Sequence, residues 1–293
     1  MRIILHAGVQ CTDNERLIKT LLRNKETFAK AGVAVPPPKL YRNLLRKTLI
    51  KGININLDIG AREHLLETIL EGTSTQINTV ILSNPMFFGI PRELLRSGQL
   101  YPNAVKILEQ FLLLFSQDDV ELYFSIRNPA SFLPTVFETS ELAEFSALMK
   151  ASNPLEIQWS ELASRLHQAF PNLPIHMWCN EDSPFIWGQI LRQMGQLPAP
   201  KNIAGDFDLF ADIISKEGFD RFKAYISTHP SLTLRQLRIV MAAFAEKFGQ
   251  TEKIIEELEA PGWDHTLVQD LTDLYDDDLK DILKVPSVRF ILP

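Results

Sequence analysis

The sequence predicts an α/β protein with three layers, in which a central parallel sheet of about five strands has helices on both faces. Short apolar runs alternate with helical patterns along residues 1–183, and most of these runs stop at a glycine, proline or asparagine. Beyond that point the patterns are helical almost throughout. We therefore expect a single domain over 1–293, formed by an α/β core at 1–183 and a helical C-terminal portion at 184–293 packed on it.

Five apolar runs predict the strands, at 2–7, 33–35, 79–83, 120–127 and 174–179. Helical spacing between them predicts helices at 13–31, 61–71, 102–116, 131–150 and 155–170. Asp13 or Asn14 can cap the first helix, and Gly32 follows its end. Residues 39–60 are harder to assign, although Tyr41, Leu45 and Leu49 suggest helical spacing.

The C-terminal portion predicts five further helices, at 184–195, 206–227, 231–248, 251–259 and 264–284. Residues 288–292 are either a short terminal strand or an apolar tail. No Gly-, Ser- or Pro-rich linker separates this portion from the core, so we expect the two to pack as one unit.

The overall composition excludes several classes of protein. With 30 Lys plus Arg against 36 Asp plus Glu, a broad basic face for nucleic acid is not expected. The two cysteines, Cys11 and Cys179, cannot form a disulfide framework, and no metal-ligand spacing includes them. The N-terminal apolar run is too short for a signal peptide, and no run is long enough to span a membrane. We expect a cytoplasmic protein without a metal.

Three strand ends are the candidates for a shared site: Gly8–Asn14, Ser83–Asn84 and Arg127–Thr135. In a parallel sheet all three lie at the same edge. Arg127 ends an apolar strand, where a guanidinium needs an anion, and Thr135 lies in the helix that follows. This pair can hold a phosphate, or Arg127 can simply form a structural ion pair.

The order of these residues resembles the sulfotransferases, which use 3′-phosphoadenosine 5′-phosphosulfate on a P-loop-like fold. In bacterial members the first strand runs into His-Ile-Gly-x-x-Lys-Thr-Gly-Thr-Thr, and His6, Gly8 and Thr12 match that register. The family's 3′-phosphate site is an Arg in Arg-Asn-Pro or Arg-Arg-Pro with a Ser eight residues later. Arg127 and Thr135 match it, with Thr in place of Ser. Further matches are Phe132, Phe137, the Ser83-Asn84 strand end and a closing helix at 263–282.

The resemblance implies a donor site formed by Gly8, Cys11, Thr12, Arg127 and Thr135, for 3′-phosphoadenosine 5′-phosphosulfate or 3′-phosphoadenosine 5′-phosphate. The phosphosulfate loop departs from the family, however. Cys11 stands at its lysine position, Asp13 at the next glycine, and Asn14 and Glu15 at its hydroxyl positions. Loss of the lysine removes a charge-assisted hydrogen bond of roughly 1.5–3 kcal/mol, and the two carboxylates add like charge.

Three functions follow from these residues. The first is a divergent sulfotransferase-like protein with weak or lost donor activation, which still binds a nucleotide or another phosphorylated small molecule. The second is an active sulfotransferase in which Arg16, Lys19 or a lysine from 39–51 supplies the missing charge. The third is a non-catalytic structural or interaction protein with a vestigial pocket. The catalytic residues and the acceptor are not predicted.

Other candidate groups have simpler interpretations. Cys11 lies at a helix N-terminus, which can activate a thiol, but the neighbouring carboxylates oppose this. We expect His6 to brace the loop, His64 to be exposed, and both Trp178 and Trp187 to be in the core. The acidic run at 275–278 is interpreted as a solvated turn.

Overall fold

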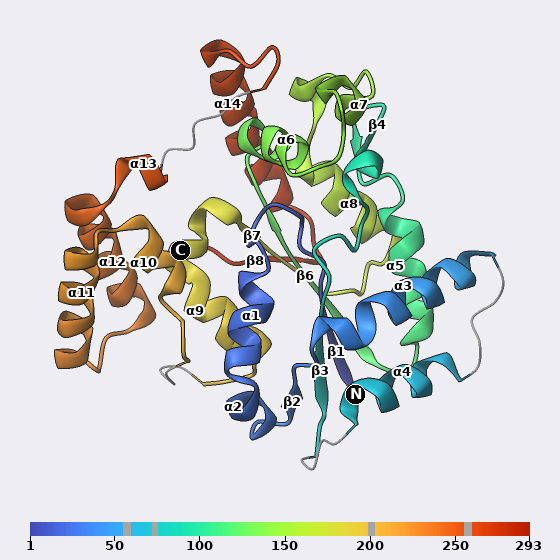
Figure 1. Cartoon of the computed structure of the whole chain (residues 1–293), viewed down its shortest axis with the longest axis horizontal. Coiled ribbons are helices and arrows are strands. Elements are labelled where there is room, and N and C mark those ends of the chain that lie inside the picture. Colours follow the sequence, from blue (N-terminus) through green and yellow to red (C-terminus); the bar gives the residue numbers. More distant parts are fainter. Residues whose placement is uncertain (55–59, 72–75, 199–202, 255–259) are drawn as a thin grey trace.

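A computed structural model describes residues 1–54, 60–71, 76–198, 203–254 and 260–293. Its centre is a sheet of six parallel strands in the order β2-β3-β1-β6-β7-β8, with helices on both faces (Figure 1). The predicted fold class is therefore confirmed, with one strand more than the five expected. The strands are β1 (Arg2–His6), β2 (Val33–Ala34), β3 (Thr79–Ser83), β6 (Asp119–Ile126), β7 (Ile175–Cys179) and β8 (Val288–Phe290). A separate antiparallel hairpin, β4 (Leu95–Arg96) and β5 (Gln99–Leu100), was not expected.

The α-helices follow the predicted order, with shorter segments. Those before β7 are α1 (Arg16–Arg23), α2 (Lys25–Ala29), α3 (Pro38–Asn54), α4 (Ala61–Leu70), α5 (Ala104–Leu114), α6 (Pro129–Glu138), α7 (Phe145–Met149) and α8 (Trp159–Ala169). Those after it are α9 (Ser183–Met194), α10 (Asp208–Ile213), α11 (Lys216–Thr228), α12 (Leu234–Phe248), α13 (Thr251–Ile254) and α14 (His265–Ile282). The predictions at 39–60 and 251–259 fall partly outside the described residues.

Three predicted helices are each two helices, because a polar side chain interrupts them. Asn24 separates α1 from α2, and its amide bonds the backbone O and N of Ala204, both at 2.9 Å. After α6, the hydroxyl of Ser140 accepts a hydrogen bond from Leu142 N in a local turn. Ser215 separates α10 from α11 by capping α11 at Gly218 N. Side chains of this kind compete with helical hydrogen bonds, which apolar spacing alone does not reveal.

The two faces of the sheet carry separate apolar layers. On one face Ile4, Ile81 and Trp178 pack against α1 and α9. On the other face Leu5 and Phe124 pack against a layer that includes α3, α4, α5 and α8. The helices that follow β1 and β7 therefore lie opposite those that follow β2 and β3, as in a three-layer fold.

The C-terminal portion contributes both to the sheet and to a separate lobe. β8 pairs with β7, which selects the strand rather than the tail for residues 288–290. Segment 203–254, which we call the lobe, has its own small core around Phe210, Phe222 and Met241 and lies at one end of the molecule (Figure 1). Among the described residues, no helix is both long and apolar enough to cross a bilayer.

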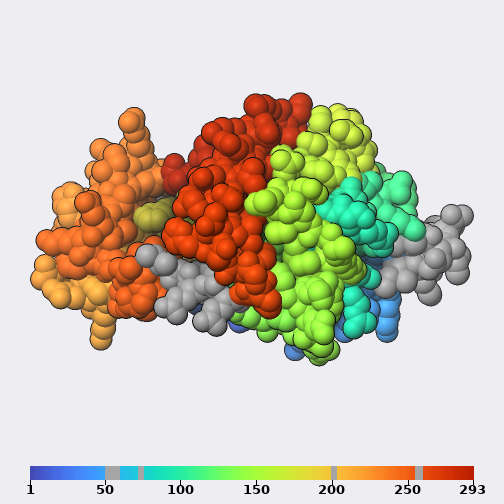
Figure 2. All heavy atoms as spheres, turned by 90° about the horizontal axis from the view of Figure 1, so that it is seen from above, coloured from blue at the N-terminus to red at the C-terminus, as the bar shows by residue number. Residues whose placement is uncertain are grey.

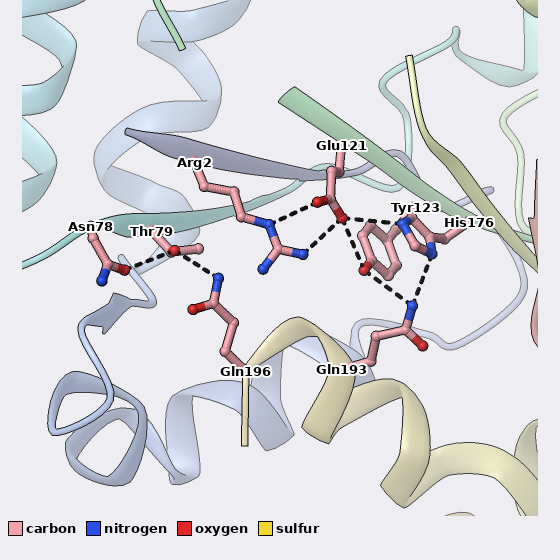
Figure 3. A network of polar contacts seen from close by, with 8 residues as sticks. All are labelled: Arg2, Asn78, Thr79, Glu121, Tyr123, His176, Gln193 and Gln196. Atoms are coloured by element: carbon pink, nitrogen blue, oxygen red, sulfur yellow. Dashed lines mark hydrogen bonds and ion pairs between the residues drawn. The ribbon is translucent and has the colours of Figure 1, made fainter. Parts of the chain in front are cut away.

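A polar network lies between the sheet and α9 (Figure 3). Arg2 donates two hydrogen bonds to Glu121, at 2.9 and 2.8 Å, and His176 Nε2 lies 3.1 Å from the same carboxylate. The ring of His176 stacks on Tyr123 at 4.1 Å, and Gln193 of α9 lies 2.8 Å from its Nδ1. The network satisfies a carboxylate that is mostly buried and fixes α9 on the sheet.

We expect Glu121 to make the free energy of unfolding depend on pH in the acidic range. Burial alone would raise the pKa of Glu121, but hydrogen bonds from His176 and Arg2 outweigh it and lower the pKa from 4.5 to about 2. Its contribution is therefore complete above pH 4.5 and is lost as pH falls through about 2. Between about pH 6 and pH 3, urea unfolding should show that wild type loses about 1–2 kcal/mol more than Glu121→Gln.

The matched control is Asp119→Asn, because Asp119 is an exposed carboxylate on the same strand. This variant should follow the wild-type pH profile. Equal profiles for wild type and Glu121→Gln would contradict the assignment.

Candidate functional site

The topology of the sheet locates a site at the carboxyl ends of β1 and β6. These strands are neighbours, and their following connections leave in opposite directions, from β1 across β3 to β2 and from β6 outward to β7. Ligands of open α/β sheets bind at such a switch point. The register also sets His6 beside Ser83 of β3, so the three predicted strand ends meet at one edge.

The loop after β1 has an unusual backbone. Gly8, Cys11, Asn14 and Glu15 all have positive φ, of 95°, 60°, 47° and 65°. Two features exclude a side chain at Gly8. Its positive φ disfavours any residue with a Cβ, and an added Cβ would lie 2.5 Å from the backbone oxygen of Pro85. The glycine therefore allows the loop to pass directly against the strand end of β3.

Asp13 occupies the N-terminus of α1. Its carboxylate accepts a hydrogen bond of 2.8 Å from Leu17 N, and its carbonyl accepts another from Arg16 N. Asp13 is only 9% exposed, so the carboxylate is held against the helix rather than in solvent. A helix N-terminus favours an anion, and here the chain supplies that anion itself. The residue at the N-cap position is Glu15 rather than the predicted Asp13 or Asn14, but the side chain of Asp13 supplies the hydrogen bond to the first turn.

Arg127 lies at the same place but binds its own chain. Its Nη1 donates to the carbonyl oxygen of Cys11 at 2.5 Å, and its Nε donates to Ser131 Oγ at 3.0 Å. Thr135 instead donates to Ser131 O at 2.8 Å, within its own helix. Ser131 thus supplies the hydroxyl that contacts the arginine, four residues before the position implied by the resemblance. The interpretation of Thr135 as a ligand contact remains a prediction.

The charges on the loop are balanced by arginines from other elements. Arg42 of α3 pairs with Glu15 at 2.5 Å and donates from Nε to Ser83 O at 2.8 Å. Arg16, at the start of α1, pairs with Asp212 of α10. The sequence predicted that a lysine from 39–51 could supply charge to the loop, but it did not single out Arg42. Helix α3 brings it to the loop, a long-range contact that no local pattern reveals.

Several buried polar atoms near the loop have no protein partner in the described structure. His6 Nδ1 lies 2.9 Å from Ser83 Oγ, but His6 Nε2, both amide atoms of Gln10 and Arg42 Nη2 are unpaired. Burial lowers the pKa of His6, Asp13 opposes this, and Arg42 reinforces it, so the imidazole is neutral at pH 7. Unpaired buried groups of this kind mark a place where a polar ligand can bind.

The side chains of Cys11 and Thr12 contact the protein itself. Thr12 Oγ1 donates to Val9 O at 2.6 Å, which closes the turn. Cys11 Sγ lies 3.2 Å from Thr139 Oγ1. Burial raises the pKa of the Cys11 thiol, although Thr139 and Arg127 act in the opposite direction. A protonated thiol is a poor nucleophile, so Cys11 has no activated role in this geometry.

Helix α14 covers the carboxyl edge of the sheet, together with α6 and α7 (Figure 2). Asn128 Nδ2 donates to Thr272 Oγ1 at 2.9 Å, and Trp263 Nε1 donates to Ala130 O at 2.9 Å. Both contacts fix α14 on the start of α6, next to Arg127. The C-terminal portion therefore forms part of the wall of the site.

The prediction of a solvated acidic turn at 275–278 is wrong. These residues lie inside α14, where Tyr275 and Asp278 are buried. Asp278 accepts hydrogen bonds from Trp159 N at 2.7 Å and Ser160 N at 3.2 Å, so it satisfies the N-terminus of α8. The other expectations hold: His64 is exposed, and Trp178 and Trp187 are each 1% exposed.

No protein-family model and no curated protein matches this chain. The assignment of function therefore rests on the geometry of the strand ends.

We expect Gly8→Ala to destabilise the fold by about 2–4 kcal/mol, from positive φ and from the contact with Pro85. The matched control is Gly262→Ala, at a similar φ of 85° but with no atom within 4 Å of an added Cβ. It should lose only about 1 kcal/mol or less. Thermal unfolding of both variants measures the difference, and equal losses would mean that the loop does not pass Pro85 as described.

Asp278→Ala should destabilise the protein by about 1–3 kcal/mol, because it leaves the buried N–H of Trp159 and the half-buried N–H of Ser160 without this acceptor. Asp277→Ala is the control, since Asp277 pairs with Lys280 on the surface of the same helix. That variant should leave the free energy of unfolding nearly unchanged, because an ion pair on the surface contributes little to stability. A similar effect of both substitutions in chemical denaturation would refute the capping role of Asp278.

Proposed function

We propose that this protein is a divergent, sulfotransferase-like protein whose loop after β1 no longer activates a sulfuryl donor. It keeps a pocket for a nucleotide or another phosphorylated small molecule at the carboxyl ends of β1 and β6. The observation that carries the proposal is the Asp13 carboxylate at the N-terminus of α1, hydrogen-bonded to Leu17 N. This carboxylate stands where a donor phosphosulfate would need positive potential.

The energetic balance favours weak binding at the loop. A phosphosulfate there would meet Asp13 and Glu15 without the lysine, whose contact is worth roughly 1.5–3 kcal/mol. Helix-dipole stabilisation of roughly 0.3–2 kcal/mol does not outweigh these losses, because Asp13 already uses it. The second half of the proposed site differs, since Arg127 lies there beside the hydroxyl of Ser131. An arginine and a hydroxyl at the start of a helix are the groups that hold a phosphate.

Two other functions have support from single observations. An active sulfotransferase would need a cation to replace the lysine, and Arg42 of α3 is a basic side chain that reaches the loop. It is paired with Glu15, and Arg16 is paired with Asp212. A purely structural protein is favoured by the way in which Arg127 binds Cys11 O, so that the chain fills its own pocket.

Calorimetric titration with 3′-phosphoadenosine 5′-phosphate separates these functions. We expect weak binding to wild type, with a dissociation constant on the order of 0.1–1 mM. Arg127→Gln should abolish it, while Asp13→Asn should tighten it by about 3- to 10-fold by removing charge and keeping an acceptor for Leu17 N. Circular dichroism of each variant controls for folding.

Two results of these measurements would contradict the proposal. No binding at millimolar ligand to wild type or Asp13→Asn would favour a structural protein. Micromolar binding to wild type, together with sulfuryl transfer from 3′-phosphoadenosine 5′-phosphosulfate to an acceptor, would favour an active enzyme.

A further inference from the structure

The outer face of α12 carries an apolar seam flanked by charges. Ile239 is 61% exposed, the highest fraction among the large apolar side chains of the described residues. Arg235, Ala242 and Glu246 on the same helix are also exposed. The spacing of these four residues, in steps of four, three and four, puts them within about 60° of one another around the helix. Such spacing is that of the seam of a two-helix coiled coil.

The opposite face of α12 is already occupied within the lobe. Met241 is buried there, and Phe244 and Phe248 pack beside it against α11. Arg238 donates to Gln189 of α9. The seam is therefore the outward side of a helix whose inward side is fixed, and it has no partner among the described residues.

We propose that this seam is a self-association surface, at which α12 packs antiparallel against α12 of a second copy of the chain. The seam is self-complementary about its midpoint, between Val240 and Met241. A twofold axis there sets Arg235 opposite Glu246 of the other copy, and Ile239 opposite Ala242. Neither Arg235 nor Glu246 forms an ion pair in the described structure, so both are available.

Charge selects this arrangement over the alternatives. A parallel pair would set Arg235 against Arg235 and Glu246 against Glu246, which is repulsive. The small side chains of Ala242 and Ala243 let a second helix approach closely, and Ile239 fills the space that they leave. The lobe lies at one end of the long axis of the molecule (Figure 1).

The size of the seam limits the strength of the contact. A helix of 15 residues buries on the order of 1,000 Å² or less in such a pair, below the area of a stable dimer. The association is therefore weak and concentration-dependent.

Sedimentation equilibrium of the full chain tests the proposal. Wild type should form dimers as its concentration rises from about 1 µM to about 500 µM, and Ile239→Asp should stay monomeric. Arg235→Glu and Glu246→Arg should each weaken the dimer by about tenfold, since each change acts twice in a symmetric pair. The double variant Arg235→Glu/Glu246→Arg should restore wild-type association.

Leu274→Asp is the matched control, because Leu274 is an exposed leucine on α14, 43% accessible, away from the lobe. It should leave association unchanged. A monomer throughout the concentration range would overturn the proposal, and so would a dimer that survives Ile239→Asp. Failure of the double variant to restore binding would overturn the antiparallel pairing.

Discussion

The carboxylate of Asp13 defines the site, because it holds the position at which this kind of loop would otherwise bind an anion. Its hydrogen bond from Leu17 N caps the start of α1 and fixes the loop that begins at Gly8. The guanidinium of Arg127 donates to the backbone oxygen of Cys11, so the cation of the site also binds the protein itself. The strand, the glycine turn and the helix are all present, but the charged groups Asp13 and Arg127 bind the backbone of this chain.

The surroundings of the loop fix this state from several directions. Arg42 links Glu15 to the end of β3, and α14 closes the edge through Asn128 and Trp263. The C-terminal portion is therefore part of the architecture of the site, since it supplies β8 to the sheet and Asp278 to the cap of α8. The lobe has its own core and an outer face that carries Ile239, and it contacts α1 through the pair of Arg16 with Asp212.

The sequence predicted the sheet well because the central strands are short, mostly buried apolar runs with a clear stop. It also predicted the edge at which Gly8, Ser83 and Arg127 meet, since parallel strands share one direction. It did not predict the partners of these residues. Ser131, Arg42 and Asp278 act over long sequence separations or through a helix register, and hydrophobic periodicity carries no information about such contacts. The helix breaks at Asn24 and Ser215 were missed for a related reason, because they depend on a polar side chain that binds backbone.

The Asp13 carboxylate occupies the anion-binding position at the N-terminus of α1. Crystals of wild type and of Asp13→Ala, grown in the same high concentration of sulfate, test it most directly. The account predicts a sulfate at the N-terminus of α1 in the variant, hydrogen-bonded to Leu17 N, and none in wild type. A sulfate bound there in wild type, with the Asp13 side chain turned away, would contradict it, and so would an empty helix N-terminus in the variant.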